Sequence, residues 1–348
     1  MASSSPSALP PSRLRWLEIS PGYACNCRCL GCYSCSADGK DQMDWPEVSS
    51  WLQKGRRMGA QHLWLSGGEP TLRKDFLATL QAARQLGYQR IKVQTNGMLF
   101  SYEHFVAKAK AAGMTEVNLL LKSLDPKVHD ALNRTPGSHA LLDKAVDVLA
   151  KTDLRLEGDV LLTTRNAEEL PQLVQHYAQR GLRHFNFWLF SLVDQGDRDL
   201  ARLIPRLTDL APLMLQAREL AHRYGASVCS LNTPHCSVPP EAWDLQFDAK
   251  GMGLLVVNPG GQAFALETSS IEQGRYVGAC AACAARPWCH GMRDDYLRVH
   301  GESELQALTA DQLALGRPQG SRLELPLPRT EPLAVRPVPL GSDPVPAE

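Results

Sequence analysis

Strand-like and helix-like segments alternate along the first two thirds of this 348-residue chain. Short apolar runs predict strands over 15–20, 62–68, 90–97, 116–122, 156–164 and 184–191. Helical spacing falls between or after them, over 44–59, 75–86, 102–112, 138–151, 167–180 and 204–224. Such alternation predicts an α/β fold of parallel strands with crossover helices, either a barrel or a doubly wound sheet. The six units counted are fewer than the eight of a full TIM barrel.

Beyond residue 225 this alternation weakens, and a second group of cysteines begins. We expect a disordered N-terminus over 1–14, a barrel over 15–224, a cysteine-bearing module over 225–300, and a helix with a Pro-rich tail over 301–348. Basic and acidic residues number 37 each, which argues against nucleic acid or an anionic membrane as partner. We find neither a secretory signal nor a membrane-spanning run, so a cytoplasmic protein is expected.

Ten cysteines in such a chain favour metal ligation over disulfides, because a reducing compartment keeps thiols free. Five of them crowd into ACNCRCLGCYSCSADG, residues 24–39. Cys29, Cys32 and Cys35 have the C-x2-C-x2-C spacing of bacterial ferredoxins, but no Cys-Pro follows. A zinc ribbon would need its second cysteine pair much closer in the chain. The register of Cys25, Cys29 and Cys32 instead leaves one iron of a four-iron cluster open to a chelating substrate.

This third register, read with its flanks as CNCRCLGCY, resembles the C-x3-C-x2-C loop of the radical S-adenosylmethionine (SAM) superfamily. The segment WLSGGEPTLR at 64–73 is similar to that family's Gly-Gly-Glu segment, and VQTNG at 93–97 to the end of its third strand. The resemblance implies that a [4Fe-4S] cluster on the three cysteines reductively cleaves SAM to a 5′-deoxyadenosyl radical, which abstracts hydrogen from a substrate. It implies the catalytic and cluster ligands Cys25, Cys29 and Cys32, with cofactor contacts from Tyr33, Gly67, Gly68, Glu69, Thr95 and Asn96.

The end of the fourth predicted strand departs from the family pattern. Lys122 closes a Leu-Leu-Lys sequence where many relatives carry Ser-Leu-Asp, and it resembles the Asp-x-Lys strand end of glycyl-radical-enzyme activases. A lysine here would pair with the SAM carboxylate as a point charge. Arg165 ends the fifth strand, where a guanidinium would bind a carboxylate or ribose. A surface lysine and an ordinary loop arginine are the alternatives.

The second cysteine group contains CAACAARPWC, residues 280–289. This segment resembles the C-x2-C-x5-C part of SPASM or twitch extensions, which hold auxiliary clusters. Arg293 stands where a full SPASM domain usually has another cysteine, so one auxiliary [4Fe-4S] cluster is expected. Zinc would use the same thiolates, and Cys229 competes with Cys236. Residues 254–266 are expected to form a hairpin. The expected ligands are Cys236, Cys280, Cys283 and Cys289.

We therefore expect a partial (β/α)6 TIM-type barrel with a small C-terminal Fe-S-binding module, acting as a radical SAM oxidoreductase or maturase. Oxidative modification or crosslinking of a peptide or protein side chain is favoured, with flavodoxin or ferredoxin as electron donor. The alternatives are a small-molecule dehydrogenase or cofactor-biosynthesis enzyme, a glycyl-radical-enzyme activase, and a non-catalytic Fe-S protein. Cys27 is expected to be a packed small hydrophobe. Cys35 is either a structural thiol or a residue near the substrate pocket.

Overall fold

The computed structural model describes residues 14–32, 42–192, 198–247, 249–269 and 274–316. One nine-stranded sheet dominates it, with the order β7-β6-β5-β4-β3-β2-β1-β8-β9. All neighbouring strands are parallel except β8 and β9, which form an antiparallel hairpin at one edge. The strands are β1 (Trp16–Ile19), β2 (His62–Leu65), β3 (Arg90–Thr95), β4 (Glu116–Leu121), β5 (Arg155–Leu162), β6 (His184–Leu189), β7 (Ser227–Leu231), β8 (Leu254–Asn258) and β9 (Gln262–Ala265).

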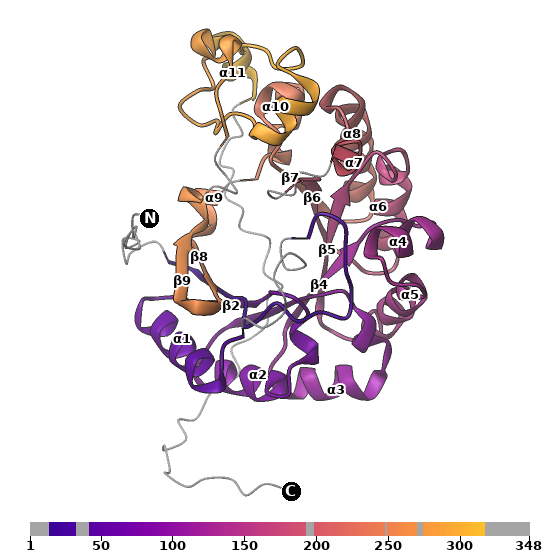
Figure 1. Cartoon of the computed structure of the whole chain (residues 1–348), viewed down its shortest axis with the longest axis vertical. Helices are drawn as coiled ribbons and strands as arrows, with labels where there is room; N and C mark the ends of the chain where they lie inside the picture. The colour runs from indigo at the N-terminus through magenta and orange to yellow at the C-terminus, as the bar shows by residue number, and fades with distance from the viewer. Residues whose placement is uncertain (1–13, 33–41, 193–197, 248, 270–273, 317–348) are drawn as a thin grey trace, which may run out of the picture.

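Helices cover the outer side of this curved sheet, as Figure 1 shows. The fold is the mixed α/β architecture that the alternation predicts, a parallel sheet curled into a partial barrel. None of the described helices has the length and apolar content that a membrane crossing requires. The α-helices are α1 (Trp45–Arg57), α2 (Phe76–Gln85), α3 (Glu103–Ala112), α4 (Pro126–Asn133), α5 (Ser138–Leu149), α6 (Leu170–Gln179), α7 (Arg198–Ala201), α8 (Leu207–Arg223), α9 (Ala249–Met252), α10 (Asp294–His300) and α11 (Ala310–Gly316).

Two helices begin with the same local device, an aspartate N-cap followed by an early proline. Asp44 accepts a hydrogen bond from the backbone N–H of Glu47 at 2.8 Å and starts α1. Asp125 accepts one from the backbone N–H of Lys127 at 2.8 Å and starts α4. The first helix begins where the sequence predicts it. The second is an additional helix between β4 and α5 that the spacing analysis did not predict.

Side-chain alternation gives the sheet two different faces. On the convex face, Val117, Leu119 and Leu121 of β4 are fully buried in the main core beneath the helices. The intervening residues face the concave side, where β4 places Glu116 and Asn118. A smaller apolar cluster fills part of this concave side under β1, β2 and β8, and it includes Trp16, Trp64, Leu254 and Val256.

The sheet continues past residue 225, where the sequence led us to expect a separate module. The expected hairpin forms as β8 and β9, and β8 pairs in parallel with β1, with Trp16 opposite Leu254. Strand β7 extends the sheet at the other edge, beside β6. The rest of the C-terminal segment, with α10 and α11, gathers beyond the β7 edge (Figure 1). The Pro-rich tail lies outside the described residues.

Candidate functional site

The cysteine loop, residues 22–32, follows β1 and lies at the carboxyl ends of the strands, where βα folds place their ligands. Cys25, Cys29 and Cys32 are half-buried, and none of the nine described cysteines forms a disulfide. Cys25 and Cys29 influence one another electrostatically, as do Cys29 and Cys32. The three predicted ligands therefore lie on one loop, although no three such side chains among the described residues converge closely enough to hold a single metal ion.

Gly67 and Gly68 follow β2 and press directly against the cysteine loop. A Cβ atom on Gly67 would lie 2.6 Å from the carbonyl oxygen of Gly22, and one on Gly68 would lie 2.3 Å from that of Ala24. The backbone N–H of Gly68 donates to the carbonyl of Gly22 at 2.9 Å. Glycine is needed here because any side chain would push the loop away from the sheet. The predicted contact of these glycines with SAM stays a prediction, and the structure gives them this packing role as well.

Glu69 connects the ends of β2 and β3. Its Oε1 accepts hydrogen bonds from the hydroxyls of Thr71 and Thr95 at 2.5 and 2.8 Å, and its Oε2 accepts one from the backbone N–H of Asn96 at 2.8 Å. Burial raises the pKa of Glu69, and these hydrogen bonds oppose that rise. The predicted cofactor contacts Glu69, Thr95 and Asn96 thus form one network below the cysteine loop. Their contact with SAM remains predicted.

Asn96 connects this hydrogen-bond network to the cysteine loop. Its side-chain amide donates to Asn26 Oδ1 at 2.7 Å and lies 3.6 Å from Cys27 Sγ. Cys27 is 2% exposed, so it is packed as expected, and its thiol also contacts Met98 Sδ at 3.7 Å. Hydrogen bonding to Cys25 and Cys29 raises the pKa of Cys27. Cys27 therefore keeps its proton beside two thiols that lose theirs more readily.

The thiols of Cys25 and Cys29 are tuned toward the thiolate, which is the form that ligates iron. A hydrogen bond with Cys27 lowers the pKa of Cys25. The same partner lowers the pKa of Cys29 to about 7, with a further contribution from the positive charge of Lys122. Both shifts run against burial, which acts in the opposite direction at each thiol. The chemistry of this donor set fits an iron–sulfur cluster.

Helix α4, which the sequence analysis did not predict, contacts the cysteine loop through Asn133, the last residue of the helix. Asn133 Oδ1 accepts a hydrogen bond from Cys29 Sγ at 3.1 Å. The Asn133 carbonyl accepts another from the backbone N–H of Arg28 at 3.1 Å. The side-chain amide of Asn133 is fixed in turn by His129 Nε2 at 2.8 Å and Ser138 at 3.1 Å. The sequence analysis missed this residue, although Asp125 and Pro126 mark the start of its helix.

Lys122 and Arg165 differ in their surroundings. Lys122 is 7% exposed at the end of β4, where its charge acts on Cys29, so it is not an ordinary surface lysine. Arg165 is exposed. Its neighbour Asn166 makes the connection between strands, since its amide donates to the carbonyl of Lys122 and to that of Leu161. Asn166 is another residue that the sequence analysis missed. Ligand binding by Lys122 or Arg165 stays a prediction.

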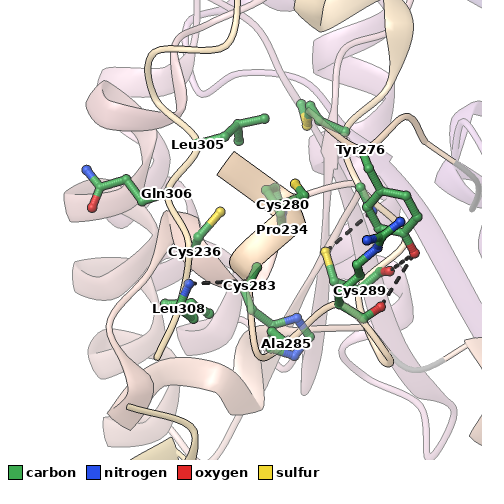
Figure 2. A pocket seen from close by; sticks show the side chains of 14 residues that line it. Pro234, Cys236, Tyr276, Cys280, Cys283, Ala285, Cys289, Leu305, Gln306 and Leu308 are labelled. Atoms are coloured by element: carbon green, nitrogen blue, oxygen red, sulfur yellow. Dashed lines mark hydrogen bonds between the residues drawn. The ribbon is translucent and has the colours of Figure 1, made fainter. Parts of the chain in front are cut away.

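Four cysteines of the C-terminal segment line one pocket, which Figure 2 shows. Cys236 lies in the short helix η5 (His235–Ser237), Cys280 lies in η9 (Gly278–Ala282), and Cys283 and Cys289 follow it. Burial raises the pKa of Cys236, with smaller contributions from the other three thiols. Within the described ranges, no group of three or more His, Cys, Asp or Glu side chains is close enough together to hold a single metal ion. The four thiols surround the pocket and do not meet at one point. We call this pocket, lined by Cys236, Cys280, Cys283 and Cys289, the thiol pocket.

Neighbouring residues support the pocket without adding a thiol. The Leu308 backbone N–H lies 3.4 Å from Cys283 Sγ, and the Tyr276 hydroxyl donates to the carbonyl of Cys289 at 2.7 Å. Cys229 does not line the pocket, because it lies in β7 with its thiol 3.0 Å from Asn186 Oδ1. Cys236 is therefore favoured over Cys229 as the fourth cysteine of the thiol pocket.

Two site predictions fall outside the described residues. Tyr33, expected beside SAM, and Cys35, left open between two roles, both belong to the segment 33–41. The structure neither supports nor opposes either expectation.

Comparison with known proteins places these features in a family. Residues 19–186 match the family model of the radical SAM superfamily. Residues 19–186 form a radical SAM domain. Radical SAM membership implies a [4Fe-4S] cluster and SAM as cofactors, and the three half-buried thiols at the strand ends fit such a cluster.

The individual proteins that the chain resembles carry different names. The chain is 29% identical over 171 residues to a probable GTP 3′,8-cyclase of Sulfurisphaera tokodaii, covering 48% of this chain and 53% of that protein. The chain spans about half the length of the curated relatives it matches. Its fold is similar to that of Streptococcus suis SuiB bound to SAM, with a TM-score of 0.64 at 14% identity, covering 85% and 77% of the two chains. SuiB bound to its precursor peptide SuiA gives a TM-score of 0.63 at 15% identity, covering 85% and 76%.

Proposed function

We propose that this radical SAM enzyme oxidatively modifies or crosslinks a peptide side chain and uses a second [4Fe-4S] cluster in the thiol pocket. The observation that carries the proposal is the pocket itself, in which Cys236, Cys280, Cys283 and Cys289 surround one space beyond the barrel edge. The fold likeness to SuiB extends over 85% of the chain, and a SuiB structure holds a precursor peptide, which supports a peptide substrate.

The residues of the chain divide the work between two places. Cys25, Cys29 and Cys32 would hold the cluster that, with SAM bound, supplies a 5′-deoxyadenosyl radical. Glu69 and Asn96 fix the loop on which these thiols lie, and so hold the reacting groups in register. The thiol pocket would hold a group able to take up the second electron of a two-electron oxidation.

A second candidate is ring formation on a small molecule in cofactor biosynthesis. The sequence relatives favour it, because several of them are named GTP 3′,8-cyclase at 28–29% identity. The matched region covers about half of this chain and about half of each relative. The likeness therefore does not extend over the whole of either protein.

The substrate class is tested with anaerobically reconstituted enzyme, SAM and dithionite. One arm contains a synthetic peptide library and the other contains GTP, and mass spectrometry follows the products. The proposal expects peptides that lose two hydrogen atoms only when SAM is present, together with 5′-deoxyadenosine. Conversion of GTP with no peptide product would reject the peptide proposal in favour of the second candidate.

A further inference from the structure

The N-terminus of helix α8 is capped by side chains from a distant part of the chain. Its own N-cap residue, Arg206, makes no side-chain cap hydrogen bond. Instead, the backbone N–H of Leu207 donates to the Tyr296 hydroxyl at 2.9 Å, and the backbone N–H of Thr208 donates to Glu304 Oε1 at 3.2 Å. The first N–H groups of a helix lack partners within the helix and carry its partial positive charge, so a carboxylate is a favourable cap. The C-terminal segment therefore completes the start of a barrel helix.

Glu304 is the centre of this contact. Its side chain is 5% exposed, and Arg206 Nη1 lies 3.5 Å from Glu304 Oε1. The same carboxylate accepts hydrogen bonds from the Thr208 hydroxyl at 2.5 Å and from the Tyr296 hydroxyl. Tyr296 belongs to α10, and Glu304 follows that helix. One buried carboxylate thus connects α8, α10 and the chain beyond α10.

The chain that follows Glu304 forms one wall of the thiol pocket. Figure 2 shows the three residues of this stretch that line the pocket, Leu305, Gln306 and Leu308. The backbone N–H of Leu308 is directed at Cys283 Sγ, at 3.4 Å. The Leu308 carbonyl accepts a hydrogen bond from the backbone N–H of Ala284 at 2.8 Å, which holds this stretch beside the cysteine. We call residues 304–308 the strap.

A backbone N–H beside a cysteine sulfur influences the group that the sulfur binds. The N–H stabilises negative charge on the sulfur, and hydrogen bonds to the sulfurs are among the factors that set the potential of an iron–sulfur cluster. Partners outside the ligand set also support metal affinity, and their loss costs about 10–100-fold. The N–H of Leu308 holds its position only while the strap lies against the pocket. Glu304 fixes the start of the strap four residues earlier.

We propose that Glu304 is a positioning residue for the thiol pocket, because it fixes the strap on α8 so that the Leu308 N–H reaches the sulfur of Cys283. The inference rests on the proposed function for the nature of the bound group, a [4Fe-4S] cluster. The strap itself would cover any metal held by the four thiols. Releasing Glu304 from α8 should therefore loosen metal in the pocket and spare the cysteine loop, which Asn96 and α4 hold instead.

Retention is tested on the anaerobically reconstituted enzyme by following metal release to a chelator. Glu304→Ala should lose metal from the thiol pocket at least tenfold faster than wild type, because it removes the acceptor of Thr208 and Tyr296. Glu304→Gln keeps one acceptor oxygen and should restore most of the retention. Glu302→Ala, at an exposed position two residues earlier, should behave as wild type. Equal release from Glu304→Ala and wild type would overturn the inference.

A background without the second site separates positioning from general loss of stability. Cys283→Ala leaves only the first site loaded, and adding Glu304→Ala to it should not change the release of iron from that site. Release accelerated equally in the two backgrounds would show that Glu304 only stabilises the fold, and would also overturn the inference.

A redox titration followed by electron paramagnetic resonance tests the Leu308 N–H without changing Glu304. Leu308→Pro removes the N–H, and Leu308→Ala keeps it while losing the same buried side chain. The proline variant should lower the midpoint potential of the second cluster by the equivalent of a tenfold change in the reduction equilibrium, about 59 mV for one electron. The alanine variant should keep the potential of wild type. Equal potentials in all three enzymes would contradict the role of the strap.

These outcomes distinguish the inference from the proposed function. If the thiol pocket holds one zinc that Glu304→Ala releases faster, the strap is supported and the second cluster is refuted. If wild type binds eight irons and Glu304→Ala releases them no faster, this inference alone is refuted.

Discussion

Arg293 donates a hydrogen bond from Nη2 to the carbonyl oxygen of Phe190 at 2.6 Å, which connects the C-terminal segment to the end of β6. The ring of Phe190 continues the connection, because a Cβ on Gly31 of the cysteine loop would lie 2.5 Å from it. Arg293 stands where a further cysteine was considered from the sequence. Its guanidinium is held by Asp295, whose carboxylate accepts from the Ser191 hydroxyl at 3.0 Å. The segment with the thiol pocket is thus fixed against the loop that carries the other three cysteines.

Replacing Arg293 should destabilise the protein strongly. The variant Arg293→Ala leaves Asp295, which is 8% exposed, without its cation, and breaking a buried pair on one side costs about 3–5 kcal/mol. Thermal unfolding followed by circular dichroism measures the effect. Arg275→Ala is the matched control, because its ion pair with Asp294 is exposed and is worth about 1 kcal/mol or less. If Arg293→Ala loses no more stability than Arg275→Ala, the contacts of Arg293 do not stabilise the fold.

Asn133→Ala should weaken retention of iron by the cysteine loop. The substitution removes the side-chain bonds to His129 and Ser138 that fix the end of α4, where the Asn133 carbonyl holds the backbone of Arg28 in the cysteine loop. Iron bound at the first site should then be lost faster to a chelator, while iron at the thiol pocket should be unaffected. Lys127→Ala, at an exposed position on the same helix, should behave as wild type. If Asn133→Ala loses iron to the chelator no faster than wild type does, α4 does not help the cysteine loop to retain iron.

Iron content should report the second cluster. Wild type should bind about eight irons, and Cys283→Ala about four, if the thiol pocket holds a [4Fe-4S] cluster. Cys229→Ala should retain about eight irons, because that thiol lies in β7 and faces Asn186 of β6 instead of the pocket. The Cys283 variant should still cleave SAM. If wild type instead binds four irons and one zinc, the thiol pocket holds a tetrahedral zinc site and not a second cluster.

Glu18→Gln should stabilise the fold at high pH and have little effect at low pH. The folded pKa of Glu18 is raised from about 4.5 to about 7, so the folded state binds the proton more tightly than the unfolded state does. Stability therefore falls as the pH rises through this window, by up to about 3 kcal/mol. The variant has no charge to bury, so its unfolding midpoint should exceed that of wild type at pH 8 and approach it at pH 4.5. A constant difference across the pH range would contradict the assignment.

Local patterns allowed much of the fold to be predicted. The period-2 and period-3.6 runs that define β1 to β6 and their helices depend on neighbouring residues only, as does the Asp44 cap of α1. The three ligand cysteines and the two glycines were also found from short spacings. Helix α4 was missed because it has only eight residues and lies directly before α5. Its start is nevertheless marked by Asp125 and Pro126.

Other features depend on residues far apart in the chain, so no local pattern reveals them. Asn133 meets Cys29 across 104 positions, and Arg293 meets Phe190 across 103. The pairing of β8 with β1 likewise joins a strand near the N-terminus to one far along the chain.

Formation of 5′-deoxyadenosine by the reconstituted enzyme with SAM and dithionite tests the central claim most directly. Wild type and Cys27→Ala should both form it, because Cys27 lies outside the predicted ligand set and is packed between Asn96 and Met98. Cys29→Ala should lose at least 99% of the activity, since its cluster would lack one of three thiolates. A Cys29→Ala variant that still cleaves SAM, or a wild-type enzyme with its iron in place that does not, would contradict the account.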